Sequence, residues 1–232
     1  MPEVTVASWN IHKGIGIDRR RDLERTAHVI GELAADVLAL QEADARFGDR
    51  RGLLDLDRLA ALGLKRVEVA GLRDLSHGWH GNVMLVRLDA EVERVERIAL
   101  PGLEPRGAIV ADLVVKNQPL RVIGTHLALL GRARIRQVAL VLDRLAVLAH
   151  RPTVLMGDTN EWRRGDRTLK GLLPHFPDSP LVPSFPAPFP ILPLDRIMLS
   201  RGQVHDFATH VSPLSRRASD HLPVRARLVL PE

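Results

Sequence analysis

Thr153-Val154-Leu155-Met156-Gly157-Asp158-Thr159-Asn160 joins an apolar, partly β-branched run to a polar end. Such a run predicts a buried strand that presents polar side chains at its carboxyl end. Asp158 and Asn160 are two residues apart, so an extended backbone directs both side chains to the same side. A carboxylate can take a proton or face a cation, and a carboxamide can donate to a phosphoryl oxygen. A glycine and an aspartate after a strand are also typical of a simple turn, so the assignment depends on partners elsewhere in the chain.

The composition is that of a soluble globular protein, with 45% apolar and 26% charged residues. No break in composition interrupts the 232 residues, and we expect a single domain over residues 1–232. No apolar run is long enough to span a membrane. Because residues 1–4 lead straight into a strand without a signal-peptide pattern, we expect a cytoplasmic monomer with no stable membrane insertion.

The chain contains no cysteine, which excludes disulfides and thiolate metal sites. Any metal must be held by oxygen or imidazole ligands, and this favours Mg²⁺ or Mn²⁺. The net charge of +5 is compatible with an anionic partner. However, nearly all of the basic residues are arginine, a skew that the nucleotide composition of a genome can also produce, so charge alone does not identify the partner.

Two segments predict similar strand–helix–strand units. In the first, residues 4–10 alternate as a strand ending at Asn10, Asp18 is a candidate helix N-cap, and residues 37–40 form a strand that leads to Glu42. The apolar residues that share one face of the intervening helix are Leu23, Ala27, Ile30 and Ala34.

In the second unit, residues 120–125 form a strand that ends at His126, and residues 153–157 form a strand that ends at Asp158. The predicted helix between them has one apolar face, made of Ile135, Val138, Leu142, Leu145 and Ala149. The strand-end residues are 32 positions apart in both units. We therefore predict an α/β fold with two similar sheets whose strand ends converge.

Further elements are predicted from periodicity and turn residues. They are a short helix over 53–62, strands over 80–86, 91–99, 194–199, 204–211 and 223–230, and a hairpin of 108–115 with 120–125. Residues 174–193 hold eight of the sixteen prolines together with Phe176, Phe185 and Phe189. A disordered linker lacks this many large apolar residues, so we predict a stiff surface loop.

Eight polar residues lie at the predicted strand ends or in the adjoining turns. They are Asn10, Glu42, His126, Asp158, Asn160, Asp195, Asp220 and His221. Each alone is explained by a turn, a solvated strand end or a buried histidine. Together, four carboxylates, two histidines and two asparagines at strand ends indicate a common site.

The ordered motifs resemble the endonuclease/exonuclease/phosphatase superfamily, which includes DNase I, abasic-site endonucleases, sphingomyelinases and inositol polyphosphate 5-phosphatases. The motifs are Ser8-Trp9-Asn10, Gln41-Glu42, Gly81-Asn82, Gly124-Thr125-His126-Leu127, Gly157-Asp158-Thr159-Asn160, Leu194-Asp195-Arg196-Ile197 and Ser219-Asp220-His221. The resemblance extends from Val4 to Val224. It implies a four-layered α/β sandwich, in which two packed mixed sheets have helices outside, and divalent-metal-dependent hydrolysis of phosphoesters.

The resemblance also implies a role for each residue at the strand ends. Glu42 would be the main magnesium ligand, with Asn10 and Asp220 close to the metal or its waters. Such an all-oxygen site suits Mg²⁺ or Mn²⁺.

The remaining strand-end residues would act on the phosphate. Asp158 would activate or orient the attacking water, and Asn160 and His126 would hold phosphate oxygens. Asp195 would orient His221, which would bind the scissile phosphate or assist proton transfer. No acidic partner of His126 is evident from the sequence, so its protonation state stays open.

Asn82, Arg106 and Arg132 are candidate substrate contacts. Arg132, Arg134 and Arg136 lie at a predicted helix N-terminus, where the dipole disfavours cations unless an anion is bound. A solvated arginine-rich face is the competing interpretation.

The sequence thus predicts a phosphoester hydrolase, with a DNA nuclease and a non-catalytic binding protein as alternatives. The apolar loop beside Asp195, with Phe185, Phe189, Ile191 and Leu192, favours a small-molecule or lipid-headgroup phosphoester. The low aromatic content of 3% disfavours a nuclease that must open a duplex, although the arginine excess keeps nucleic acid possible.

Overall fold

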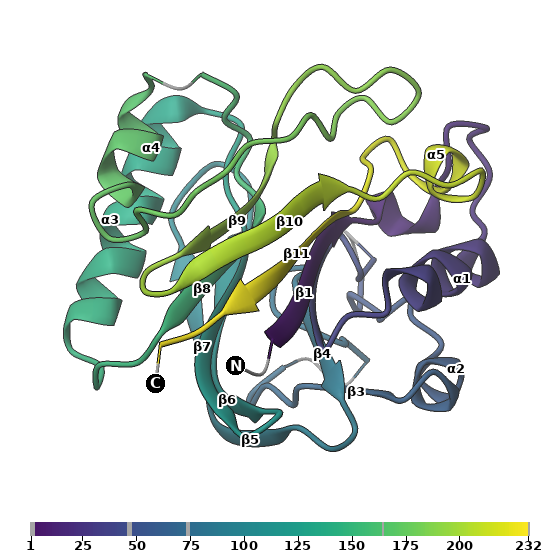
Figure 1. The fold of residues 1–232 in the computed structure, drawn as a ribbon. Coiled ribbons are helices and arrows are strands. Elements are labelled where there is room, and N and C mark those ends of the chain that lie inside the picture. The colour runs from purple at the N-terminus through teal and green to yellow at the C-terminus, as the bar shows by residue number, and fades with distance from the viewer. Residues whose placement is uncertain (1–2, 46–47, 73–74, 164, 232) are drawn as a thin grey trace.

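The computed structural model describes residues 3–45, 48–72, 75–163 and 165–231. Within them, two β-sheets pack face to face and carry helices on both outer sides (Figure 1). The six-stranded sheet has the order β10 (Gln203–Thr209), β11 (Val224–Val229), β1 (Glu3–Asn10), β2 (Val37–Gln41), β4 (Val83–Arg87), β3 (Leu64–Arg66). The five-stranded sheet has the order β5 (Glu91–Leu100), β6 (Arg106–Val115), β7 (Gln118–His126), β8 (Thr153–Asp158), β9 (Asp195–Leu199). The helices are η1 (His12–Gly14), α1 (Leu23–Leu33), α2 (Leu56–Ala61), α3 (Gly131–Ala146), α4 (Arg167–Leu172) and α5 (Ser215–Ala218).

Each sheet contains one pair of parallel neighbours, and these pairs are the two predicted units. β1 pairs in parallel with β2 across α1, and β7 pairs in parallel with β8 across α3. The other paired strands of both sheets are antiparallel, so both sheets are mixed, as the sequence predicts. In a parallel pair both strands end at the same edge, which places all four strand ends on one side of the molecule.

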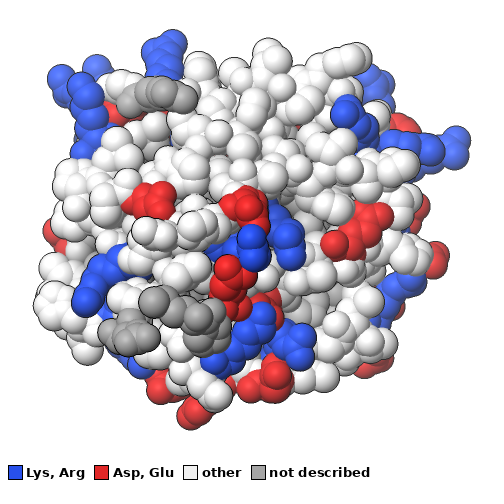
Figure 2. Space-filling model, in the orientation of Figure 1, with Lys and Arg blue, Asp and Glu red and all other residues white. Residues whose placement is uncertain are grey.

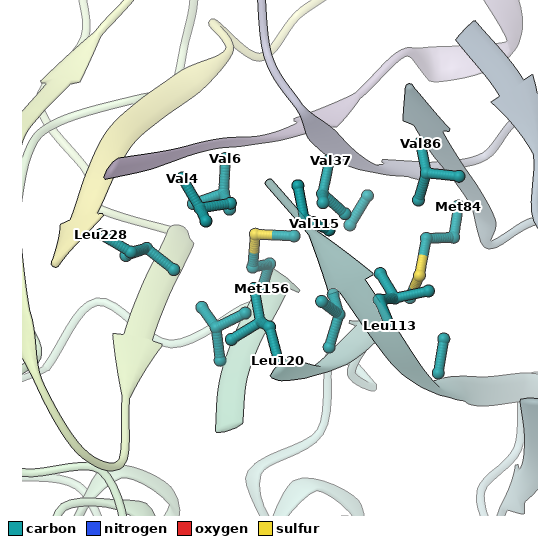
Figure 3. Close-up of a cluster of buried hydrophobic side chains, with 14 of the residues drawn as sticks. Val4, Val6, Val37, Met84, Val86, Leu113, Val115, Leu120, Met156 and Leu228 are labelled. Carbon is teal, nitrogen blue, oxygen red and sulfur yellow. The ribbon is translucent and has the colours of Figure 1, made fainter. Parts of the chain in front are cut away.

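The core has three layers of contacts, one between the sheets and one under each set of helices. Val4 and Val6 of β1 face the other sheet, whereas Ala7 and Trp9 pack with residues of α1, as the alternation of a strand requires. Figure 3 shows the inter-sheet layer, in which side chains of β1, β2, β4 and β11 meet those of β6, β7 and β8. Because β8 is covered on both faces, residues 154–156 are apolar without alternation.

The N-cap predicted for the first helix is wrong. α1 begins at Leu23, and Asp22 caps it by accepting a hydrogen bond of 2.8 Å from the Arg25 N–H. Asp18 instead lies in the preceding turn, where its carboxylate pairs with the Arg25 guanidinium at 2.8 Å. Both Asp18 and Asp22 precede the apolar stripe. Because an isolated bridge pairs Ile15 with Arg21, the residues after Asp18 are not helical and the helix starts after Asp22.

The buried face of α3 also differs from the predicted one. Arg134 and Gln137 are buried, whereas Ile135 is 37% exposed, and the helix ends at Ala146, before Ala149. Gln137 is held in the interior because its amide binds the Ala128 N–H at 2.9 Å and a backbone carbonyl at 2.8 Å. Polar side chains therefore occupy the inner face of α3, because they form hydrogen bonds with backbone groups of the neighbouring loops.

The other predicted strands are present, with β4 beginning at Val83 rather than at residue 80. β3, α4 and α5 were not predicted; each has six residues or fewer. Residues 174–193 form a surface loop without helix or strand, as predicted, and it arches over the top of the molecule in Figure 1. The same region of Figure 2 is white between charged side chains at its corners. No helix in the described part of the chain has the length and apolar character needed to cross a membrane.

Candidate active site

A cleft of about 530 Å³ opens at the edge where the parallel strands end. Most of the predicted site residues line it, namely Asn10, Glu42, Arg106, His126, Asp158, Asn160, Asp220 and His221. Asp195 lies one layer behind, while Asn82 and Arg132 are elsewhere. The strand ends of both sheets therefore meet in one place.

Asp158 is the centre of this arrangement, and it is 1% exposed. Its Oδ1 accepts a hydrogen bond of 2.9 Å from the Asn160 N–H, and its Oδ2 accepts one of 3.1 Å from the Asn10 amide. The Nε2 atoms of His126 and His221 lie 3.3 Å and 3.7 Å from the same Oδ2. Since Asn10 belongs to the other sheet, this carboxylate joins the two sheets at their ends.

The backbone around Asp158 explains the glycine before it. Gly157 has a φ of 151°, and a Cβ there would lie 1.8 Å from the Thr125 carbonyl oxygen of the neighbouring strand. Asn160 adopts the left-handed region with a φ of 50°, which asparagine tolerates well. One hydrogen of its amide is used on the Leu127 carbonyl at 2.9 Å. Asn160 thus shapes the turn as well as lining the cleft.

His126 is neutral, and its proton can be placed. Burial lowers its pKa to about 4, and the charge of Arg106 acts in the same direction. The Arg106 guanidinium can only donate, so the 2.7 Å contact makes Nδ1 of His126 the acceptor. Nε2 therefore carries the hydrogen and faces Asp158, which is the acidic partner that the sequence left open.

His221 has the opposite charge state. Its Nδ1 donates to Oδ2 of Asp195 at 2.8 Å, and this fully buried carboxylate also accepts from Ser184 Oγ at 2.6 Å. Burial by itself lowers the pKa of His221, but the charges of Asp195 and Asp158 outweigh it and raise that pKa to about 10. The Phe185 ring covers the imidazole at a centroid distance of 4.8 Å. A protonated histidine therefore stands opposite a neutral one across Asp158.

Glu42 occupies a more open position at the end of β2. It has a φ of 54°, forms an ion pair with Lys13, and accepts the Lys13 N–H on its backbone oxygen at 3.1 Å. Burial alone would raise the pKa of Glu42, but the hydrogen bond and the charge of Lys13 act against burial, and this pKa lies below its ordinary value. The carboxylate is ionised at neutral pH.

The oxygen donors of the cleft suit a hard divalent cation. Glu42 and Asp220 supply carboxylates whose side chains are 25% and 42% exposed, and Asn10 supplies an amide oxygen that already accepts the His12 N–H at 3.0 Å. The Lys13 ammonium on Glu42 shows that this position attracts a cation. Among the described residues, no three His, Cys, Asp or Glu side chains gather as a ligand set. Mg²⁺ is commonly held by one or two carboxylates and several waters, so the donors fit it.

The structure places Asn82, one of the predicted substrate contacts, behind the cleft. Asn82 is 2% exposed, and its amide donates to the Trp79 and Gly107 carbonyls at 3.0 Å and 3.1 Å. It therefore ties the segment before β4 to the start of β6, and it does not line the cleft.

Arg132, another predicted substrate contact, is exposed on α3 and lies outside the cleft. Arg134 is buried in an ion pair with Glu161 and donates to the Leu129 carbonyl at 2.7 Å. A carboxylate of the chain, rather than a bound anion, thus offsets the arginine at this helix N-terminus.

Six titratable residues of the cleft were not among the predicted site residues, namely the basic side chains His12, Lys13, Arg50 and His80 and the carboxylates Asp44 and Glu104. The signal for His12 and Lys13 was their position directly after the end of β1. Arg50 and His80 lie in irregular loops, where no periodic pattern marks them.

Comparisons with known proteins agree with this geometry. A sequence model of the endonuclease/exonuclease/phosphatase family matches residues 7–221. The Escherichia coli K12 protein YbhP, described as uncharacterized, is 27% identical over 259 residues that cover 97% of this chain and 96% of YbhP.

Solved structures share the fold. An endonuclease/exonuclease/phosphatase from Beutenbergia cavernae superimposes with a TM-score of 0.71 at 24% identity, over 99% of this chain and 72% of that one. The human Nocturnin catalytic domain with bound sulfate has a TM-score of 0.74 at 19% identity, over 99% and 94%. A mannosyl-6-phosphatase from Bacteroides thetaiotaomicron has a TM-score of 0.71 at 19% identity, over 98% and 100%. These neighbours identify a DNase I-like four-layered fold.

Proposed function

Since the chain belongs to the endonuclease/exonuclease/phosphatase family, whose members generally hydrolyse phosphoester bonds, we propose that it is a divalent-metal-dependent phosphoester hydrolase. The observation that carries the proposal is the arrangement around Asp158. This buried carboxylate receives the Asn10 amide from the other sheet and stands between a neutral and a protonated histidine. Such an arrangement has the parts that in-line attack of water on a phosphate ester needs.

Asp158 acts on the attacking water. Asn10 and the Asn160 N–H fix the orientation of its carboxylate, with one hydrogen bond on each oxygen. The water attacks phosphorus while Asp158 accepts or orients its proton, and the bond from phosphorus to the ester oxygen breaks. The leaving oxygen finally takes up a proton, which gives an alcohol and a phosphate.

The two histidines serve the phosphoryl group in different ways. Protonated His221 offers a positive charge and an Nε2–H to a phosphoryl or leaving oxygen, and Asp195 keeps it charged and oriented. Neutral His126 offers an Nε2–H without a full charge. Negative charge that develops on the phosphate is thus met by donors already in place.

Glu42 and Asp220, with Asn10, would hold a Mg²⁺ or Mn²⁺ ion. When bound, the ion neutralises charge on the phosphoryl oxygens.

We further propose a small organic or lipid phosphoester as substrate. The fold leaves this choice open, since neighbours include both a mannosyl-6-phosphatase and a Danio rerio TDP2 with a single-strand DNA product. Support comes from the cleft wall, which carries Leu129, Trp162, Phe185 and Leu192. The adjoining Phe189 is 80% exposed. Large apolar side chains at the mouth suit an organic group better than a sugar–phosphate backbone.

The first test measures hydrolysis of bis(p-nitrophenyl) phosphate after exhaustive chelation and after Mg²⁺ or Mn²⁺ is restored. We expect activity to disappear and return. Activity that survives chelation contradicts the metal requirement, and a folded protein without turnover on any ester class with any cation favours a non-catalytic binding protein.

The second test compares plasmid DNA, phospholipid vesicles and soluble phosphodiesters at several salt concentrations. We expect the soluble or vesicle substrates to be preferred, and Phe189→Ser to reduce vesicle turnover selectively if the substrate is a lipid. Efficient DNA nicking that falls steeply with salt, as binding to a phosphate backbone requires, would instead identify a nuclease.

A further inference from the structure

The strand order gives the cleft two chemically different ends. The sheets face each other so that β9 packs on β11 and β1, β8 packs on β1 and β2, and β6 packs on β4. The row of strand ends is therefore bordered on one side by the loops that precede β9 and β11. On the other side it is bordered by the loops beside β4 and β6. Asp158 of β8 and His126 of β7 lie between these ends.

The end next to β9 and β11 has an apolar wall beside Asp220 and His221. Phe185 and Leu192 line it and pair with each other in a short bridge of the loop that leads into β9. The loop is fixed to the residues before β11, since the Ala187 N–H donates to the Asp220 carbonyl at 2.7 Å and the Leu222 N–H to the Ser184 carbonyl at 2.8 Å. This wall is therefore held in place beside the reacting centre.

The end next to β4 and β6 carries three basic side chains, beside the carboxylates of Asp44 and Glu104. Arg50 comes from the loop after β2, His80 from the segment before β4, and Arg106 from the start of β6, and all three line the cleft. Arg50 Nη1 donates to Nδ1 of His80 at 2.6 Å. A Cβ on Gly107 would lie 3.2 Å from the His80 ring, so His80 abuts the residue that follows Arg106. The three side chains form one wall.

The two arginines of this wall differ in how their charge is balanced. Arg106 forms an ion pair with Glu104. Arg50 is only partly exposed, and no carboxylate in the described parts of the chain forms an ion pair with it. A guanidinium has five N–H donors, of which the contact with His80 uses one. Arg50 therefore presents an unbalanced charge with several donors to the cleft, which matches a phosphate group.

We propose that Arg50 and His80 form a second phosphate-binding subsite, distinct from the reacting centre at Asp158. The substrate is then a phosphoester that carries a second phosphate on one side of the reacting phosphorus and an organic group on the other. The proposal rests on the proposed function, because it assigns a substrate class to the same cleft.

The kinetic test uses two p-nitrophenyl phosphodiesters, the ethyl ester and the phosphonoethyl ester, which differ only in a second anionic group. We expect the wild type to hydrolyse the phosphonoethyl ester with a kcat/KM about tenfold higher, the scale of one charge-assisted contact. Arg50→Gln lowers this ratio to about one. Arg51→Gln, which removes an exposed neighbouring arginine outside the cleft, keeps the ratio.

A binding test separates this subsite from catalysis. Calorimetry with excess Mg²⁺ compares butylphosphonate with phosphonobutylphosphonate, a matched ligand that carries a second phosphonate. We expect tighter binding of the second ligand by the wild type and the Arg51→Gln variant, and equal binding of both ligands by Arg50→Gln. If this preference is found without turnover of either ester, the proposed function fails and the subsite stands. If neither the ester ratio nor the ligand preference depends on Arg50, the subsite is overturned whether or not the protein is a hydrolase.

Discussion

The two parallel units, β1-α1-β2 and β7-α3-β8, have the same connection and differ in the environment of their strand ends. The first ends in Asn10 and Glu42, and the second in His126 and Asp158. The Glu42 side chain is 25% exposed and pairs with Lys13. The side chains of His126 and Asp158 are 4% and 2% exposed and face each other.

Under the proposed function, this difference lets one scaffold support two chemical tasks. Burial keeps His126 neutral, and buried carboxylates keep the adjoining His221 protonated, so the second unit controls where protons lie. The partly exposed Glu42 stays ionised and accessible, which suits a cation that retains part of its water. The strand ends thus place the side chains in one cleft, and the burial of each side chain determines its charge state and its access to solvent.

The largest effect is expected from Asp158→Asn in the buried unit. The amide has the same shape but cannot accept a proton, so kcat should fall about 10³-fold or more while the protein stays folded. Steady-state turnover and circular dichroism measure both properties. Asp143→Asn, on the exposed face of α3, is the matched control and should be silent. A folded Asp158→Asn protein with near-normal turnover would show that another group handles the water.

His221→Asn should lower kcat about 10²-fold, because the charged donor is lost. Asp195→Asn acts through His221, so the double variant should be no slower than His221→Asn alone.

In the wild type, activity that needs protonated His221 is kept below pH 10 and lost as pH rises through about 10. Removing the Asp195 charge lowers the pKa of His221 and moves this loss to lower pH. A pH–kcat/KM profile unchanged by Asp195→Asn would contradict the pairing.

Substitutions at the end of the first unit, around Glu42, should change metal affinity rather than proton transfer. Glu42→Gln should weaken Mn²⁺ binding about tenfold or more, since a charged oxygen ligand is lost. Lys13→Met should strengthen it several-fold, because the ammonium no longer competes for Glu42. Titration of free Mn²⁺ by electron paramagnetic resonance measures both changes, with Lys170→Met at an exposed position of α4 as control. Weaker binding by Lys13→Met would show that Lys13 supports the ion instead.

The strand ends were predictable because the strands are buried on both faces, which makes the apolar runs and their polar ends visible in the sequence. Loop residues were not. His80 reaches the cleft and Asn82 does not, because the Ala43 N–H binds the Gly81 carbonyl at 2.9 Å and Asn82 turns to the Gly107 carbonyl. These contacts join segments far apart in sequence, so local pattern cannot supply them. The buried side of α3 was missed for a related reason, since the Gln137 amide binds one backbone carbonyl and one backbone N–H of the neighbouring loops rather than an apolar core.

The smallest predicted effect is a change in stability at the starts of α1 and α3. Asp22 caps α1 with a side-chain hydrogen bond, whereas Leu130, the N-cap of α3, has none, although its φ of −84° and ψ of 123° suit a capping residue. Asp22→Ala should therefore destabilise the protein by about 1 kcal/mol. Leu130→Asp should stabilise it by up to about 1 kcal/mol, because the carboxylate gains a cap contact and meets a helix start that has no acidic residue in its first turn. Leu130 is 56% exposed, so Leu130→Ala loses little packing and isolates the contribution of the cap. Urea titrations measure the three free energies of unfolding. If Leu130→Asp and Leu130→Ala have equal stability, the α3 start gains nothing from a cap, and the two units differ in how their helices begin as well as in their strand ends.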